Sequence, residues 1–473
     1  MLFFSPPMQF NLNAAGAGGA VPITYWLAGA YDGAGTENVF PADLEVDSTG
    51  NIYILSTMSS ATYGTANSGF VLSKLNASGE FQWHKILDGA QGGNDGAAAG
   101  SKGGALAIDG DDNIIVAQTG RDRGAISVNT GFVIKISPAG SIIWQQVQDP
   151  GNSIKETRSY GVVVDKSTND VYVTGETNSI TALGTFGTYV IKYNSSGTQQ
   201  WMSAFGVTGN DAGHALRLDS NGDVLVSGAT TSGALRGMVA KLSKSTGAIS
   251  WSRYVGNTTN NKSFADMAID GDDPVMVGWN SQNSSGSNDL WVVKYNNSGT
   301  YQWGRLLGGS ANDQGYAIAT DDSGNVYVSG FQSSDVAHTS VTQTLELAKY
   351  NSSGTIQWQK RFTADNNSLN TNQIVGMRFH PDGSLIFCIF SGNGIGPTYS
   401  IQVMKLPADD TLWPSTIGDW SIATSSVTDK AAATTQGTIS FTTATSGISA
   451  TAGTYLLSDP SATFTEAKTD ITI

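Results

Sequence analysis

The sequence predicts an all-β fold: a seven-bladed β-propeller of four-stranded antiparallel blades, closed by an N-terminal strand. Three landmarks predict it, because each returns once in every repeat unit. Tryptophans recur 50 to 61 residues apart, and a lysine precedes the last seven of them by eight to ten residues. An Asp-led turn marks six of the units, and in the seventh copy, HPDGS, His380 stands in the Asp position. The tryptophans are Trp26, Trp83, Trp144, Trp201, Trp251, Trp303, Trp358 and Trp413. One small sheet cannot cover both of its faces, so such units stack around an axis.

The strands within one unit follow from two kinds of turn. AIAT (317–320) precedes the turn DDSGN and VYVSG (326–330) follows it, which predicts a hairpin with a short Asn/Gly turn. WVVKY (291–295) and YQWGRLL (301–307) flank the turn NNSG in the same way. Each unit therefore holds four short antiparallel strands, and its tryptophan is expected to fill the wedge between neighbouring blades.

A ten-residue phrase occurs three times in the chain. Its copies are KYNSSGTQQW (192–201), KYNNSGTYQW (294–303) and KYNSSGTIQW (349–358). Asn194, Asn296 and Asn351 each open an Asn-x-Ser sequence, which is the acceptor pattern for sugar attachment. Asn and Gly also supply the positive φ of a tight reversal, and Ser caps it through its hydroxyl. We therefore interpret the phrase as the end of one strand, a turn and the start of the next.

The number of landmarks predicts how the ring closes. Eight tryptophan strands accompany only seven copies of the other three strands, and the surplus copy is ITYWLAGAY (23–31). It is expected to supply the outer strand of the last blade, where Pro407 and Pro414 make a poor ladder strand and the chain leaves the ring. The alternative is an eight-bladed ring that uses the C-terminal residues. The predicted division is an N-terminal arm (1–22), the propeller (23–418) and a C-terminal tail (419–473).

Two resemblances follow from these phrases. SGNVYVSG (323–330) and VVKYNNSGTYQW (292–303) resemble the bacterial SBBP-type β-propeller repeats, which occur in varied surface and secreted proteins. KLPADDTLWPSTIGDWSIATSSVTD (405–429) is similar to the segment that closes the propeller repeats in virion tail or fibre proteins of marine tailed phages. The Ser/Thr/Ala-rich tail has too little apolar surface to fold alone. It is expected to pack on the propeller or on a neighbouring subunit.

Composition limits the classes of partner. The net charge is −14 and the basic residues are scattered, which argues against nucleic-acid binding. No apolar run reaches membrane-span length, and the N-terminus lacks the basic region of a signal peptide, so export by the usual route is not expected. No cofactor motif appears. No catalytic residue can be proposed either, because the four histidines fall in unrelated places and no nucleophile elbow or phosphate loop is present.

Two sets of polar residues are weighed as sites. The carboxylates of two Asp turns lie close enough to be weak calcium candidates, although no bidentate Glu follows them and capping of their own turns is favoured. These are Asp109, Asp111, Asp112, Asp270, Asp272 and Asp273. Loops leading into the next blade end at pairs that could bind sugars at the rim, although hydrogen bonding to backbone groups at the blade junctions is favoured. These are Asn94, Asp95, Asn210, Asp211, Asn312 and Asp313.

The resemblance of residues 405–429 implies a structural virion protein of a tailed phage, a tail or fibre component, and the Ser/Thr/Ala-rich tail, the low content of charged residues and the missing signal peptide agree with it. No enzymatic activity is expected of this chain. Its expected partners are other virion proteins, copies of itself, and a host-surface glycan or protein. The alternative is a secreted or cell-surface bacterial propeller that binds glycan or protein.

Overall fold

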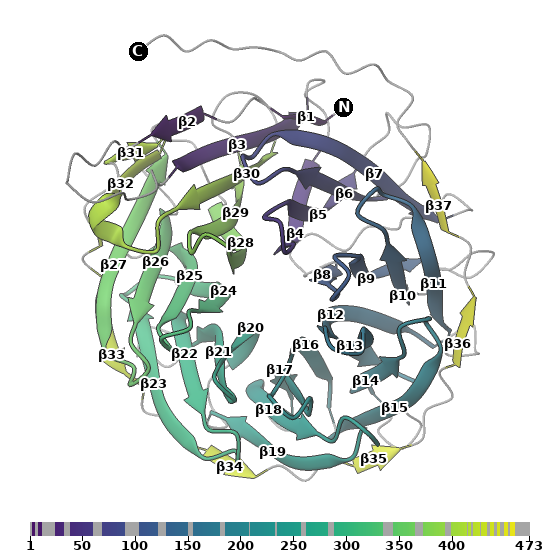
Figure 1. Ribbon diagram of the computed structural model, residues 1–473. Helices are drawn as coiled ribbons and strands as arrows, with labels where there is room; N and C mark the ends of the chain where they lie inside the picture. Colours follow the sequence, from purple (N-terminus) through teal and green to yellow (C-terminus); the bar gives the residue numbers. More distant parts are fainter. Residues whose placement is uncertain are drawn as a thin grey trace.

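The computed structural model is a ring of seven antiparallel sheets around a central channel (Figure 1). Each sheet contains the four strands of one blade, and further strands pair with its outer edge. It describes residues 2–4, 8–11, 24–32, 38–59, 69–89, 104–121, 129–149, 155–179, 185–207, 209–231, 234–256, 262–281, 288–333, 344–364, 372–392, 399–413, 415–417, 420–425, 427–432, 436–438, 442–444, 449–452 and 455–458. Within these residues the one helix is a 3-10 turn, Asp410–Leu412. The prediction of an all-β seven-bladed propeller is confirmed.

Blades are numbered in chain order, and each runs from an inner strand to an outer one. Blade 1 contains β4 (Asn38–Val46), β5 (Ile52–Ser59), β6 (Gly69–Leu75) and β7 (Phe81–Gly89). Blade 2 contains β8 (Gly104–Ile108), β9 (Ile114–Arg121), β10 (Asn129–Ile136) and β11 (Ile142–Asp149). Blade 3 contains β12 (Thr157–Asp165), β13 (Asp170–Thr177), β14 (Gly187–Tyr193) and β15 (Gln199–Gly206). Blade 4 contains β16 (Asp211–Leu218), β17 (Val224–Thr230), β18 (Arg236–Leu242) and β19 (Ile249–Val255).

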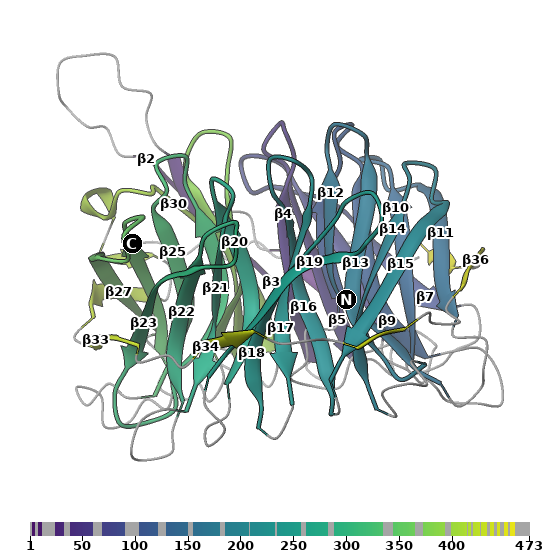
Figure 2. The same ribbon diagram turned by 90° about the horizontal axis from the view of Figure 1, so that it is seen from below.

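The remaining blades repeat this order. Blade 5 contains β20 (Lys262–Asp270), β21 (Asp273–Asn280), β22 (Asp289–Tyr295) and β23 (Tyr301–Gly308). Blade 6 contains β24 (Gln314–Thr320), β25 (Val326–Gln332), β26 (Thr344–Tyr350) and β27 (Ile356–Ala364). Blade 7 contains β28 (Asn372–Phe379), β29 (Leu385–Gly392), β30 (Tyr399–Leu406) and, from the start of the chain, β3 (Thr24–Asp32). Figure 2 shows the ring from the side, with the strands running between its two faces.

The N-terminal strand closes the ring. β3 pairs antiparallel with β30, with Trp26 opposite Lys405 and Ala30 opposite Ile401. This pairing joins the beginning of the chain to its last blade, so the predicted closure is confirmed and the eight-bladed alternative is wrong.

The core lies in the seams between blades. The buried side chains form seven clusters, each shared by two neighbouring blades. In one of them Tyr172 and Phe205 of blade 3 pack against Leu216 and Met238 of blade 4. Each large apolar side chain buried in this way contributes roughly 1.5–3 kcal/mol. The seams, and not the individual sheets, therefore hold the ring together.

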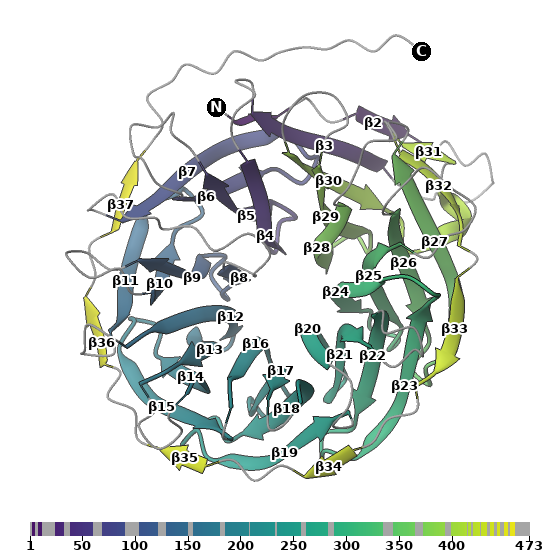
Figure 3. The ribbon, with the colours of Figure 1, turned by 180° about the vertical axis from the view of Figure 1, so that it is seen from behind.

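A second layer of strands surrounds the ring, which we call the belt. It adds a further strand to the outer edge of blades 6, 5, 4, 3, 2 and 1 in that order, as the perimeter strands in Figures 1 and 3 show. Its strands are β31 (Thr416–Ile417), β32 (Trp420–Thr424), β33 (Thr428–Ala431), β34 (Gln436–Thr438), β35 (Thr442–Ala444), β36 (Ser449–Ala452) and β37 (Tyr455–Ser458). In blade 7 the outer strand β3 pairs instead with β1 (Leu2–Phe4) and β2 (Met8–Asn11).

The composition of the tail suits the belt. All six blades receive their belt strand in antiparallel register, for example Arg305 opposite Ala431 and Gly206 opposite Thr442. Such pairing uses backbone N–H and C=O groups, so small Ser, Thr, Ala and Gly residues suffice. An uncovered outer strand would expose a row of unpaired backbone groups that recruits other chains. The belt removes this hazard from six blades, and β1 and β2 cover part of the seventh.

Candidate functional site

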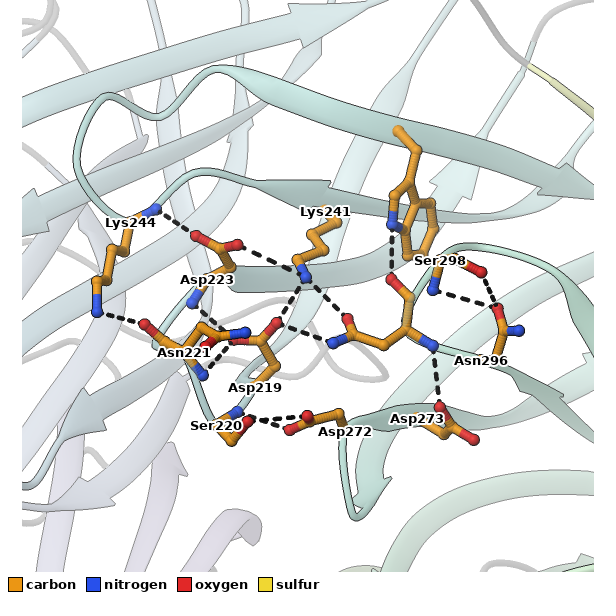
Figure 4. Close-up of polar contacts among 12 residues, drawn as sticks. Asp219, Ser220, Asn221, Asp223, Lys241, Lys244, Asp272, Asp273, Asn296 and Ser298 are labelled. Atoms are coloured by element: carbon orange, nitrogen blue, oxygen red, sulfur yellow. Dashed lines mark hydrogen bonds and ion pairs between the residues drawn. The ribbon is translucent and has the colours of Figure 1, made fainter.

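The face of the ring that carries the Asp-led turns holds a network of polar contacts. In blade 4, Asp219 accepts backbone hydrogen bonds from Asn221 (3.0 Å) and Asp223 (2.9 Å) in its own turn, shown in Figure 4. Lys241, on the third strand of the blade, forms an ion pair with Asp219 at 2.6 Å. The same lysine position pairs with a turn aspartate in five blades. These pairs are Lys135–Asp109, Lys192–Asp170, Lys241–Asp219, Lys294–Asp270 and Lys405–Asp382.

This network crosses the seams between blades. Asn297, in the KYNNSG turn of blade 5, accepts from Lys241 Nζ of blade 4 at 2.9 Å through its side chain. Its backbone carbonyl accepts the indole N–H of Trp251 at 2.9 Å. Gly299 of the same turn, at φ +77°, lies so close to the Trp251 ring that a Cβ there would be 2.8 Å from Cδ2. The turn in the repeated phrase thus packs against the tryptophan of the preceding blade.

The other tryptophans occupy corresponding places. Trp144, Trp201 and Trp303 donate their indole N–H to the backbone carbonyls of Ser195, Lys244 and Ser352 in the following blade. Trp83 packs against the cluster between blades 1 and 2, and Trp358 lies edge-on to Trp413 with ring centroids 5.2 Å apart. Trp26 lies on β3, but its side chain is outside the described part of the chain.

Each of the six calcium candidates is engaged by a protein partner, and Lys294 lies near both Asp270 and Asp273. In blade 2, Asp109 binds Lys135, Asp111 accepts from Asn169 at 2.7 Å and Asp112 accepts from Ser48. In blade 5 the partners of Asp270, Asp272 and Asp273 are Lys294, Ser220 and the backbone N–H of Asn297. Across the described ranges no group of three or more His, Cys, Asp or Glu residues is placed to hold a metal ion.

The rim pairs are divided between backbone contacts and surface. Asn94 and Asp95 lie outside the described residues. Asp211 is fully buried and accepts the backbone N–H of Val207 at 2.6 Å, and this burial raises its pKa to about 6. Asp313, also fully buried, accepts from the backbone of Gly309 (2.9 Å) and Ser333 (2.8 Å). Asn210 is exposed and Asn312 is half-buried.

Sequence reasoning did not single out the charged residues of the central channel. A cavity of about 370 Å³ opens there, bounded by inner strands of all seven blades. Arg378 donates through Nε to Glu45 at 2.6 Å and through Nη2 to Asp43 at 3.3 Å, which joins blade 7 to blade 1. Arg217 of blade 4 reaches Asp266 of blade 5 at a longer 3.4 Å. Burial raises the pKa of Glu45, an effect that Arg378 opposes.

A signal for the channel residues exists in the repeat. Glu45, Arg217 and Arg378 all stand two residues before the first position of the Asp turn. Most blades have a small apolar residue at this position, such as Ala107 or Ala319. An alignment of the seven units at this position would have singled out the three charged residues.

Comparison with known proteins supports the repeat family. The family profile "SBBP: Beta-propeller repeat" matches residues 302–330. No curated protein matches the sequence.

Among solved structures, the chain is similar to polysaccharide lyase Uly1 at 9% identity (78% of this chain, 90% of that chain, TM-score 0.44). Quinohemoprotein alcohol dehydrogenase from Comamonas testosteroni is 10% identical (81% and 78%, TM-score 0.41). Periplasmic gluconolactonase PpgL of Pseudomonas aeruginosa is 12% identical (73% and 95%, TM-score 0.37). Likenesses this distant carry no argument about activity.

In the described part of the chain, no helix is long and apolar enough to cross a membrane.

Proposed function

We propose that this chain is a structural protein of a tailed-phage virion, a tail or fibre component that presents a propeller for assembly and host-surface contact. The observation that carries the proposal is the belt, in which the Ser/Thr/Ala-rich tail covers the outer edge of six blades. A particle exposed outside the cell cannot replace damaged subunits, so slow unfolding matters more to it than turnover. With Cys388 as its single cysteine, the chain forms no internal disulfide, and the belt would supply that resistance by backbone pairing.

The proposal includes no enzymatic role. The carboxylates of the turn face are engaged by lysines, by turn N–H groups and by neighbouring blades. Carboxylates held in this way suit structural contacts better than proton transfer. The resemblance of residues 405–429 to the closing segment of phage propeller proteins adds support for a virion. We expect other virion proteins or further copies of this chain as partners, and a host glycan or protein at the exposed surface. With a net charge of −14, nucleic acid is not expected among them.

A second candidate is a secreted or cell-surface bacterial propeller that binds glycan or protein. It is favoured by the SBBP repeat match at residues 302–330, since such repeats occur in surface and secreted proteins. Exposed Asn210 at the rim would then be a contact for a sugar hydroxyl.

Immunogold electron microscopy separates the two candidates. Antibodies raised against the purified chain are applied to phage particles and to cell envelopes from the same source culture. Label at the tails or fibres of particles is expected. Label confined to cell envelopes, with none on particles, would overturn the virion proposal in favour of the second candidate.

A further inference from the structure

The seam between blades 5 and 6 contains a buried glutamate. Glu346 lies on β26, three residues before Lys349 of the repeat. The other six blades have uncharged residues at this position, most of them large and apolar: Val71, Phe132, Tyr189, Met238, Trp291 and Gln402. Glu346 is fully buried, and neither of its carboxyl oxygens forms a hydrogen bond within the described residues. A buried carboxyl group without partners is far more costly when it is ionised than when it is protonated.

The side chain of Glu346 is directed toward blade 5. Alternate residues of a strand share a face, and Ala348 and Tyr350, on the same face of β26, belong to the apolar cluster between blades 5 and 6. Arg361 is opposite Glu346 in the register of β26 and β27, yet no hydrogen bond joins the two side chains. Among the described residues, no cation offsets a negative charge on Glu346.

The belt covers this seam from outside. Its residues 425 and 427–429, which we call the belt crossing, lie between blades 6 and 5. Ser425 is buried and donates its backbone N–H to the carbonyl of Gln359 at 3.2 Å. Gln359 Nε2 donates in return to the carbonyls of Ser425 and Val427, each at 2.9 Å. Val427 packs against the apolar cluster of the same seam.

A second contact holds the far end of the belt crossing. Asp429 accepts a hydrogen bond from the buried hydroxyl of Tyr350 at 3.2 Å and lies 3.8 Å from Arg305 of blade 5. Burial raises the pKa of Asp429, an effect that Arg305 opposes. Burial and the charge of Asp429 raise the pKa of Tyr350 well above its ordinary value. Asp429 is therefore the second carboxyl group whose titration must be separated from that of Glu346.

The surroundings of Glu346 favour its protonated form. Burial raises the pKa of Glu346 well above its ordinary value. The hydroxyl of Ser425 in the belt crossing opposes this shift, and the negative charge of Asp313, at the start of blade 6, adds to it. Glu346 thus lies beneath the belt crossing, in a position where a negative charge would be neither hydrated nor neutralised.

We propose that Glu346 is a proton-dependent lock of the belt, which keeps the belt crossing closed over the seam while its carboxyl group is protonated. Opening of the belt crossing admits water to Glu346, and the hydrated carboxyl group then releases its proton. The closed form is favoured fully below the ordinary glutamate pKa of about 4.3, and this preference is lost as pH rises through the raised pKa of the closed form. The lock does not depend on the proposed virion role.

Hydrogen exchange of the backbone amides, measured by mass spectrometry between about pH 5 and about pH 9, tests the lock. At each pH the exchange rate of the belt crossing is divided by its rate in E346Q, which cancels the chemical pH dependence of exchange. Gln402 occupies the same repeat position in blade 7, so the fold already accepts glutamine there. Between the ordinary and the raised pKa of Glu346, the ratio should increase about tenfold per pH unit, because opening releases one proton. A ratio that is constant with pH would overturn the proposal.

Two further comparisons assign the effect to Glu346 and to the belt. Within the unmodified chain, the belt crossing should gain exchange relative to β34, which covers blade 4; this comparison stands even if E346Q fails to fold. An equal gain in β34 would show that the proton is released only when the whole ring unfolds, and the lock would be excluded. D429N should keep the pH dependence of the unmodified chain. If D429N abolishes it, the proton belongs to Asp429 and the assignment of Glu346 is wrong.

Discussion

Replacing Gly354 by alanine tests the contact between the repeated turn and the tryptophan of the preceding blade. Gly354 has φ +76°, and a Cβ there would lie 2.5 Å from Cδ2 of Trp303 and 2.9 Å from two further ring atoms. Carbon atoms pack best at about 3.5–4.0 Å, so the ring or the turn must move. Alanine in the left-handed region costs about 1–2 kcal/mol. Overpacking adds about 1–3 kcal/mol. We therefore expect G354A to lower the free energy of unfolding by about 2–5 kcal/mol.

Gly383 provides the matched control. It occupies the equivalent left-handed conformation in a turn of blade 7, at φ +82°, but a Cβ there would meet nothing within 4 Å. G383A should therefore cost only the backbone strain, about 1–2 kcal/mol. Both variants are measured by guanidinium unfolding followed by tryptophan fluorescence. In the double variant W303A/G354A the clash is removed, so the two costs should be less than additive. Equal destabilisation by G354A and G383A would refute the reasoning, because the tryptophan contact would then contribute nothing.

Three further predictions follow from the same structure. Burial raises the folded-state pKa of Asp211 to about 6, above the unfolded value of about 3.9. The protonated side chain therefore contributes fully to the free energy of unfolding below the unfolded pKa, and this contribution is lost as pH rises through the folded pKa. D211N should therefore be more stable than the unmodified chain at pH 8, by about 1–3 kcal/mol, and equal to it at about pH 3.5; an identical difference at both pH values would contradict this. Deleting residues 1–31 removes the strand that pairs with β30 and should lower the melting temperature and cause self-association, whereas a monomer with unchanged melting would exclude the N-terminal closure. Ending the chain after residue 418 removes the belt from β32 onward. We expect the seven seam clusters to keep the propeller folded, while proteolysis at the uncovered outer strands becomes faster and incorporation into particles fails. Unfolding of this truncated chain would show that the belt is part of the fold.

The blades and their closure were predictable from the sequence because their signals are local. A turn such as NNSG determines its own geometry through Asn296 and Gly299, and the alternating strands beside it place Trp251 and Lys241 within one repeat of that turn. A mismatch in the number of copies then identified the N-terminal strand as the missing member of blade 7. These inferences follow from the repeat and from the number of its copies.

The belt and the channel depended on the tertiary structure. Belt strands such as β34 and β35 pair through backbone groups, so their small side chains carry no pattern that specifies a partner blade or the reverse order around the ring. Glu45 and Arg217 are 172 residues apart in the chain, and they oppose each other only because seven blades place the fourth across from the seam of the first and last. The sequence already favoured backbone hydrogen bonds for Asp211 and Asp313, but their complete burial is decided by packing at the blade junctions. Local chemistry thus encodes the repeat unit, while ring closure creates the spaces and edges that function can use.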